Sequence, residues 1–178
     1  LGVDASAPVT QLQLTGPSYL GNRLFTASST LVGFAAQDPS VDGIAAGVTR
    51  TEFRLDASTS IATFTAAFTL PEGEHALVYR SVDNLGLFET NRSTAITSDA
   101  TPPATSLLVN GQPAGGASII AISTDVFSLT STDTASGVAA IRYHLDGGAE
   151  NAFMADFSLP PGSHTLAYFA VDNVGNFE

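Results

Sequence analysis

Six aspartates stand at matched places in the two halves of this sequence. Asp99, Asp133 and Asp172 lie in the second half, and their counterparts in the first half are Asp4, Asp38 and Asp83. Carboxylate and carbonyl oxygens are the ligands that the hard cation Ca²⁺ prefers. The sequence therefore offers Asp99, Asp133 and Asp172 as candidate calcium ligands at the junction between the two halves, and it predicts no other cofactor. Glu72 and Glu74 are expected to face this junction from the first half.

A second interpretation of the aspartates needs no metal. Asp133 precedes Ser136-Gly137 and Asp172 precedes Asn173 and Gly175, and in such contexts Asp accepts hydrogen bonds from the backbone of its own turn. Both interpretations remain open from the sequence, and unfolding with and without a chelator distinguishes them.

Histidine also repeats, with His75 in the first half and His164 in the second. A metal site needs several converging ligands, and each half supplies one such histidine. The sequence therefore predicts that each histidine is a partner for the backbone of a neighbouring turn. His144 has no counterpart and is predicted to be exposed to solvent.

Residues suited to catalysis are not found in any recognised arrangement. The chain has no Gly-x-Ser-x-Gly sequence and suggests no Ser–His–acid set, and it has no cysteine. A pair of carboxylates could serve glycoside hydrolysis, but small β-sandwiches rarely build the deep cleft that this chemistry needs. We predict no catalytic residue and no enzyme activity.

The candidate residues are carried by a unit that occurs twice. Residues 75–89 read HALVYRSVDNLGLFE and residues 164–178 read HTLAYFAVDNVGNFE. Such close similarity indicates two copies of one small domain. We assign residues 1–98 to the first domain, with 1–8 as a linker, and residues 99–178 to the second.

Short alternating stretches bounded by Gly and Pro indicate an all-β fold, most simply a β-sandwich of about seven strands in each domain. The repeated stretch is expected to be a strand with Leu77 and Tyr79 facing the core, followed by a returning strand over residues 89–97. The second domain lacks this last strand within the chain, so its edge is predicted to be open. The chain opens at Leu1 without Met, which favours a piece of a longer protein.

Charge excludes two classes of partner. The formal net charge is −11, and all six basic residues are arginine. The basic patches used for nucleic-acid binding are missing, and an anionic membrane surface would repel the chain. The apolar run at residues 118–122 is far shorter than the ~20 residues of a membrane span, so no membrane insertion is predicted.

The second half carries a pattern that resembles the immunoglobulin-like repeats of large bacterial surface and secreted proteins. The matching residues include Asp99, Pro102, Thr132-Asp133, Ser136-Gly137-Val138, Tyr143, Leu145-Asp146-Gly147-Gly148, Gly162, His164, Tyr168, Asp172-Asn173, Gly175-Asn176 and Glu178. The first half departs from it at Phe53, Ala57-Ser58 and Leu87. The resemblance implies two tandem immunoglobulin-like β-sandwich domains in an extracellular or cell-surface protein.

Together these observations favour a non-catalytic structural or adhesion segment, a rigid spacer whose partners are adjacent repeats of the same polypeptide. One alternative is an accessory module of a secreted enzyme that binds a glycan or protein ligand. Another is a filament subunit that joins neighbouring copies by strand addition at the open edge.

Overall fold

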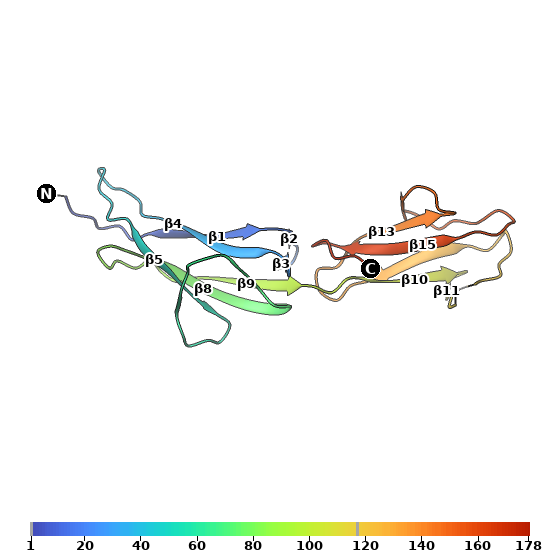
Figure 1. Ribbon diagram of the computed structural model, residues 1–178, viewed down its shortest axis with the longest axis horizontal. Helices are drawn as coiled ribbons and strands as arrows, with labels where there is room; N and C mark the ends of the chain where they lie inside the picture. The colour runs from blue at the N-terminus through green and yellow to red at the C-terminus, as the bar shows by residue number, and fades with distance from the viewer. Residues whose placement is uncertain (1, 117) are drawn as a thin grey trace. The chain divides into compact units, whose positions relative to one another are not determined.

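The computed structural model describes residues 2–116 and 118–178, so that Leu1 of the expected linker lies outside the described residues. The chain forms two compact units, Leu1–Asp99 and Ala100–Glu178. Each unit is built of β-strands, as the period-two patterns predict (Figure 1). Among the described residues no helix is long and apolar enough to cross a membrane.

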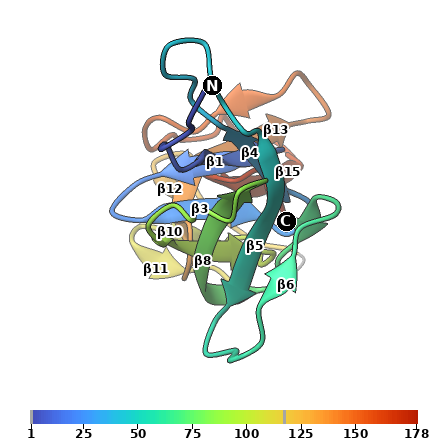
Figure 2. The same ribbon diagram turned by 90° about the vertical axis from the view of Figure 1, so that its left-hand side faces the viewer.

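The first unit has two sheets. The smaller sheet has the order β1-β4-β7, with β1 at Val9–Thr15, β4 at Leu31–Gln37 and β7 at Phe68–Thr69. The larger has the order β2-β3-β9-β8-β5-β6. Its strands are β2 (Ser18–Leu20), β3 (Leu24–Ala27), β9 (Arg92–Asp99), β8 (Gly73–Asp83), β5 (Val48–Leu55) and β6 (Ala62–Thr63). Figure 2 shows β5 and β8 side by side, with β1 and β4 above β8 in the other layer.

The core of the first unit lies between these sheets. Its buried members are Val32, Leu70, Leu77, Tyr79 and Ile96. Leu77 is fully buried and Tyr79 is 6% exposed, which confirms the phase predicted for the repeated strand. A continuous register positions the two residues, because Leu55 pairs with Leu77 and Phe53 with Tyr79 across β5 and β8.

The second unit repeats the same plan with fewer strands. One sheet has the order β11-β10-β12, with β11 at Gln112–Pro113, β10 at Ala104–Val109 and β12 at Phe127–Thr132. The other has the order β14-β13-β15, with β14 at Asn151–Ala152, β13 at Val138–Leu145 and β15 at Leu166–Asp172. Leu107, Phe127 and Leu129 form its buried core, against which Leu166 and Tyr168 pack.

Strand β15 is an edge strand within the described residues. It pairs with β13 on one side. In the first unit the equivalent strand β8 pairs with β5 on one side and with β9 on the other. The strand order of both units is that of tandem immunoglobulin-like β-sandwich domains.

Two details differ from the sequence prediction. The hairpin β2–β3 was not predicted, and β3 extends the larger sheet by pairing parallel to β9. The returning strand β9 begins at Arg92 rather than at residue 89, because the Glu89 side chain turns inward and binds other strands.

Candidate metal centre

Asp83 ends strand β8 and holds the turn that follows. Its Oδ1 accepts hydrogen bonds from the backbone N–H groups of Leu85 and Leu87, each at 2.8 Å. The residue is 2% exposed. Its other oxygen, Oδ2, is buried and has no hydrogen-bond partner among the described residues. One oxygen of this carboxylate therefore fixes the turn, and the other accepts no hydrogen bond from the described residues.

Asp38 follows strand β4 and closes the loop to β5. Its Oδ2 accepts the backbone N–H of Gly47 at 2.6 Å. Its Oδ1 is buried and, within residues 2–116 and 118–178, has no hydrogen-bond partner. The Asp38 carboxylate is thus used in the same divided way as that of Asp83.

Asp4 lies in the irregular segment before β1. Its Oδ1 accepts the backbone N–H of Ser6 at 3.0 Å, and its Oδ2 accepts the N–H of Ala46 at 2.6 Å. These backbone hydrogen bonds stabilise the ionised form and hold the pKa of Asp4 below its usual value. Asp4 thereby ties the start of the chain to the loop that Asp38 also closes.

The three carboxylates of the first unit converge. Asp4, Asp38 and Asp83 each offer one oxygen, and these atoms all lie within 4.8 Å of one another. Three separate parts of the chain supply them: the segment before β1, the end of β4 and the end of β8. The matched positions read from the sequence therefore correspond to one place in the fold.

Of the candidate ligands Asp99, Asp133 and Asp172, Asp99 ends strand β9 in the first unit, and the other two belong to the second unit. Asp133 Oδ1 accepts N–H groups from Ala135 and Gly137, and Asp172 Oδ1 accepts those of Val174 and Asn176. Asp133 Oδ2 is buried without a hydrogen-bond partner among the described residues. Asp99 and Asp172 are 0% and 2% exposed. By contrast, Glu74 forms an ion pair with Arg23 of its own unit.

The geometry is compatible with both sequence interpretations of the aspartates, metal binding and turn capping. Asp38, Asp83, Asp133 and Asp172 each use one oxygen to bind turn backbone, as the capping interpretation requires. Because a carboxylate has two oxygens, capping a turn does not use up its capacity to bind a cation.

The repeated histidines bind turn backbone, as predicted, and each also has a carboxylate partner. His75 Nε2 lies 2.9 Å from the carbonyl oxygen of Pro71, and its Nδ1 lies 3.0 Å from Oδ2 of Asp56. His164 makes the same two contacts with Pro160 and Asp146. His144 was predicted to be simply exposed, but its Nδ1 lies 3.0 Å from the carbonyl oxygen of Gly148, within its own hairpin.

A buried polar network around Glu89 was not predicted. Glu89 Oε1 accepts the N–H of Ser81 at 2.9 Å, and Oε2 accepts the N–H of Thr10 at 3.2 Å. The Thr10 hydroxyl also donates to Oε1 and lies 2.6 Å from the Ser81 hydroxyl. Glu178 binds Thr105 and Ala170 in the same way in the second unit. The signal was the glutamate that ends both copies of the repeat.

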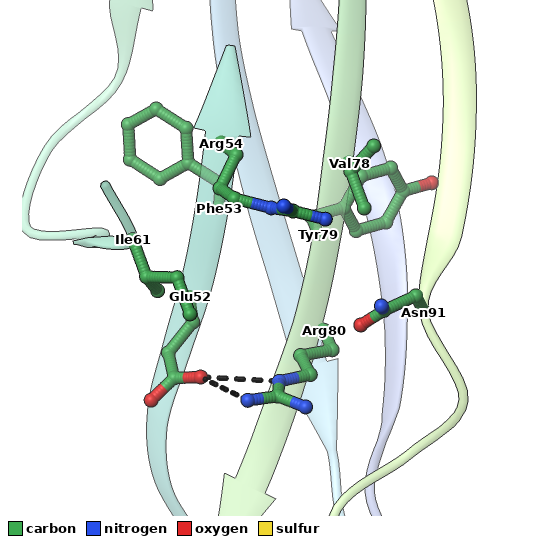
Figure 3. Close-up of a pocket in the computed structure, with 8 residues that line it drawn as sticks. All are labelled: Glu52, Phe53, Arg54, Ile61, Val78, Tyr79, Arg80 and Asn91. Carbon is green, nitrogen blue, oxygen red and sulfur yellow. Dashed lines mark hydrogen bonds and ion pairs between the residues drawn. The ribbon is translucent and has the colours of Figure 1, made fainter. Parts of the chain in front are cut away.

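Cavities lie elsewhere. A shallow pocket of about 220 Å³ opens on the β5–β8 face, where Figure 3 shows Glu52 and Arg80 joined across adjacent strands. Arg80 Nε donates to Glu52 Oε2 at 3.1 Å, and the Arg80 guanidinium also lies 4.3 Å from the Phe88 ring centroid. A second cavity of about 720 Å³ lies in the second unit beside residues 118–123 and 159–164. None of the six aspartates lines either cavity.

The tyrosine side chains offer little flat surface for a sugar ring. Tyr79 is buried, and Tyr143 and Tyr168 pack against the core of the second unit. Tyr19 of strand β2 is 38% exposed but stacks on Phe25 with 6.3 Å between ring centroids.

Comparison with known proteins finds similarity to solved structures alone. No family model matches the chain, and no curated protein matches it. Among solved structures it is similar to fibronectin(III)-like modules of Clostridium thermocellum CbhA, at 14% identity over 94% of this chain and 88% of that one, with a TM-score of 0.43. The assignment of the immunoglobulin-like fold therefore depends on the strand order and pairing.

Proposed function

We propose that this chain is a non-catalytic spacer or adhesion segment, made of tandem immunoglobulin-like repeats, in a larger surface or secreted bacterial protein outside the cell. Its partners on this proposal are adjacent repeats of the same polypeptide. The acidic surface, with a net charge of −11, fits a segment that stays soluble and does not bind nucleic acid.

The strongest support for this proposal is that the same side-chain interactions occur in both units. The His–Asp–Pro contacts recur at His75 and His164, and the glutamate network recurs at Glu89 and Glu178. Each of these interactions joins a turn or a strand to its neighbour within one unit. Both units keep these interactions while their loops differ in length and composition, which suits a mechanical or spacing role.

Single-molecule force spectroscopy on the 178-residue chain tests the proposal. A spacer is expected to unfold in separate force peaks, one for each unit, each releasing about 3.4 Å per residue. Extension of the chain with no resolved force peak would contradict a mechanical role.

The alternative of a glycan-binding accessory module is tested by a glycan array with the same chain. The spacer proposal expects no selective binding, because the repeated tyrosines face the cores. Selective binding that is lost on changing Tyr19, Arg80 or Phe88 would favour the accessory module instead.

A further inference from the structure

The carboxylates of Asp4, Asp38 and Asp83 lie close together, and two of them have a buried oxygen with no hydrogen-bond partner among the described residues. Asp83 is 98% buried, since 2% of its surface is exposed, and its Oδ2 has no hydrogen-bond partner among the described residues. Asp38 Oδ1 is in the same state. Burying an ionised oxygen without a partner is costly, and placing a second carboxylate beside it adds repulsion.

The donors already present do not resolve this cost. The turn amides of Leu85 and Leu87 bind Oδ1 of Asp83, and the amide of Gly47 binds Oδ2 of Asp38. These bonds leave the opposite oxygen of each carboxylate unpaired. A cation between the carboxylates would satisfy the free oxygens together and remove the repulsion between them.

We propose that Asp4, Asp38 and Asp83 bind a hard divalent cation of the Ca²⁺ class. Two oxygens bound to the same Ca²⁺ at about 2.3–2.6 Å are at most about 4.6–5.2 Å apart. The three carboxylate oxygens, which all lie within 4.8 Å of one another, meet this limit. All three side chains are oxygen donors, as a hard cation requires, and the chain has no cysteine to attract a softer metal.

Asp133 of the second unit, the counterpart of Asp38, shows the same divided use of a carboxylate. Its Oδ1 accepts turn amides, and its Oδ2 is buried and unpartnered within the described residues. The proposed site does not depend on this, since all its ligands belong to the first unit, and it does not depend on the proposed spacer role.

An ion at the first site would add a further connection between three segments of the chain. Asp4 anchors the irregular segment before β1, Asp38 begins the β4–β5 loop, and Asp83 begins the β8–β9 turn. Binding would stabilise the native state by mass action, because the unfolded chain does not bring these residues together. The expected consequence is a higher melting temperature in Ca²⁺ than in chelator.

Isothermal titration of the metal-free 178-residue chain with CaCl₂ tests the proposal directly, alongside melting in CaCl₂ and in EDTA. We expect saturable binding and a rise of several degrees in the melting temperature with Ca²⁺. Mg²⁺ is expected to bind at least tenfold more weakly, since it requires shorter and more regular coordination. No saturable binding of Ca²⁺ with no melting shift, or tighter binding of Mg²⁺, would overturn the proposal.

Two variants locate the site. Asp83→Asn keeps an oxygen for the turn amides but removes the charge, and Asp4→Asn lies in a segment outside the sheets. Either change is expected to remove this binding or to weaken it at least tenfold. Asp125→Asn is the matched control, because Asp125 also binds turn groups at Asn110 and Ile122 but lies outside the cluster of Asp4, Asp38 and Asp83.

The assignment is wrong if Asp4→Asn binds Ca²⁺ with the stoichiometry and affinity of the wild type. If Asp83→Asn does not fold, Asp4→Asn decides alone, because it changes no residue of the β-sheets. A loss of binding in Asp125→Asn equal to that in Asp4→Asn would also contradict the site, since it would show a diffuse effect of total charge.

Discussion

His164 Nδ1 lies 2.8 Å from Oδ2 of Asp146, which belongs to the hairpin turn that precedes it by 18 residues. The other ring nitrogen lies 3.0 Å from the carbonyl oxygen of Pro160. A carboxylate and a carbonyl are both acceptors, so a ring that donates to both carries two protons. The geometry therefore favours the imidazolium form, and the pair at His75 and Asp56 has the same arrangement.

The histidine contacts predict stability that falls as the pH rises. Burial lowers the pKa of His75, but its hydrogen bonds with Asp56 and Pro71 outweigh burial, so the net shift is upward. The hydrogen bond to Asp146 raises the pKa of His164. Because the folded-state pKa lies above the unfolded value near 6.5, the stabilisation is complete below that pH and is lost as the pH rises through the folded pKa.

Melting temperatures between about pH 5.5 and 8.5 check this expectation. The double variant His75→Gln/His164→Gln is expected to melt lower at pH 5.5 and to show a flatter profile than the wild type. His144→Gln is the control, since His144 contacts a backbone carbonyl and no carboxylate in its hairpin. A double variant with the wild-type slope would show that other groups cause the pH dependence.

The sequence predicts more of this fold than of its side-chain pairing. The alternating period and the repeat were enough to predict two β-sandwiches and the core phase of Leu77 and Tyr79, and they marked Asp4, Asp38 and Asp83, which converge in the first unit. These features follow from the order of the strands, which comparison of the two copies of the repeat reveals. The partners of His75 and Glu89 depend on register and on loop geometry, which no local pattern encodes.

The hairpin β2–β3 shows why the remaining part could not be predicted. Its first strand, Ser18–Leu20, is exposed at all three positions and so has no alternation to detect. Within residues 100–116 and 118–178 the second unit shows no equivalent pair of strands, so comparison of the two halves does not reveal the hairpin. Its place beside β9 is a parallel, long-range contact that is set by tertiary structure.

Glu89 is expected to contribute most to the first unit among the acidic side chains outside the aspartate trio. It is 8% exposed and accepts bonds from Thr10, Ser81 and Arg92. Glu89→Gln replaces one acceptor oxygen with a donor that faces other donors, which should cost about 1–3 kcal/mol. Chemical denaturation measures this loss, with hydrogen exchange in β1 and β8 reporting on the first unit.

Glu150→Gln is the matched control for Glu89→Gln. Glu150 pairs with Arg142 at 3.8 Å, and both side chains are more than a third exposed, so its loss should cost well under about 1 kcal/mol. Equal effects of the two changes would contradict a special role for the buried network.

Acid is expected to weaken the same network. Burial raises the pKa of Glu89, but its hydrogen bonds with Thr10, Arg92 and Ser81 outweigh burial, so the net shift is downward from 4.5. A depressed folded-state pKa stabilises the native state above the unfolded value, and this stability is lost as the pH falls through the folded value. Between about pH 5 and 2.5 the wild type should therefore lose more stability than Glu89→Gln. Denaturation curves at several pH values measure the difference, and parallel curves for the two proteins would contradict it.

The hairpin between β13 and β14 allows the energetic cost of a positive φ angle to be measured separately from steric clashes. Asp146 and Gly147 have φ angles of 53° and 68°, and Gly148 N–H closes the turn on the carbonyl of Leu145 at 2.9 Å. A Cβ added at Gly147 would meet no atom within 4 Å, so Gly147→Ala has no steric clash with neighbours. Its cost should be the left-handed conformation alone, roughly 1–2 kcal/mol. Gly147→Asn should cost less, because Asn tolerates this region.

Gly115→Ala completes the comparison. Gly115 also has open space around its Cβ position, but its φ is not in the left-handed region. This change should be neutral or slightly stabilising, because alanine reduces the entropy of the unfolded chain. Equilibrium denaturation of the three variants should therefore rank stability as Gly115→Ala above Gly147→Asn above Gly147→Ala. If Gly147→Ala were as stable as Gly115→Ala, the turn would not require a positive φ at this position, and the reason for Gly in the second unit where the first has Ala57 would have to lie elsewhere.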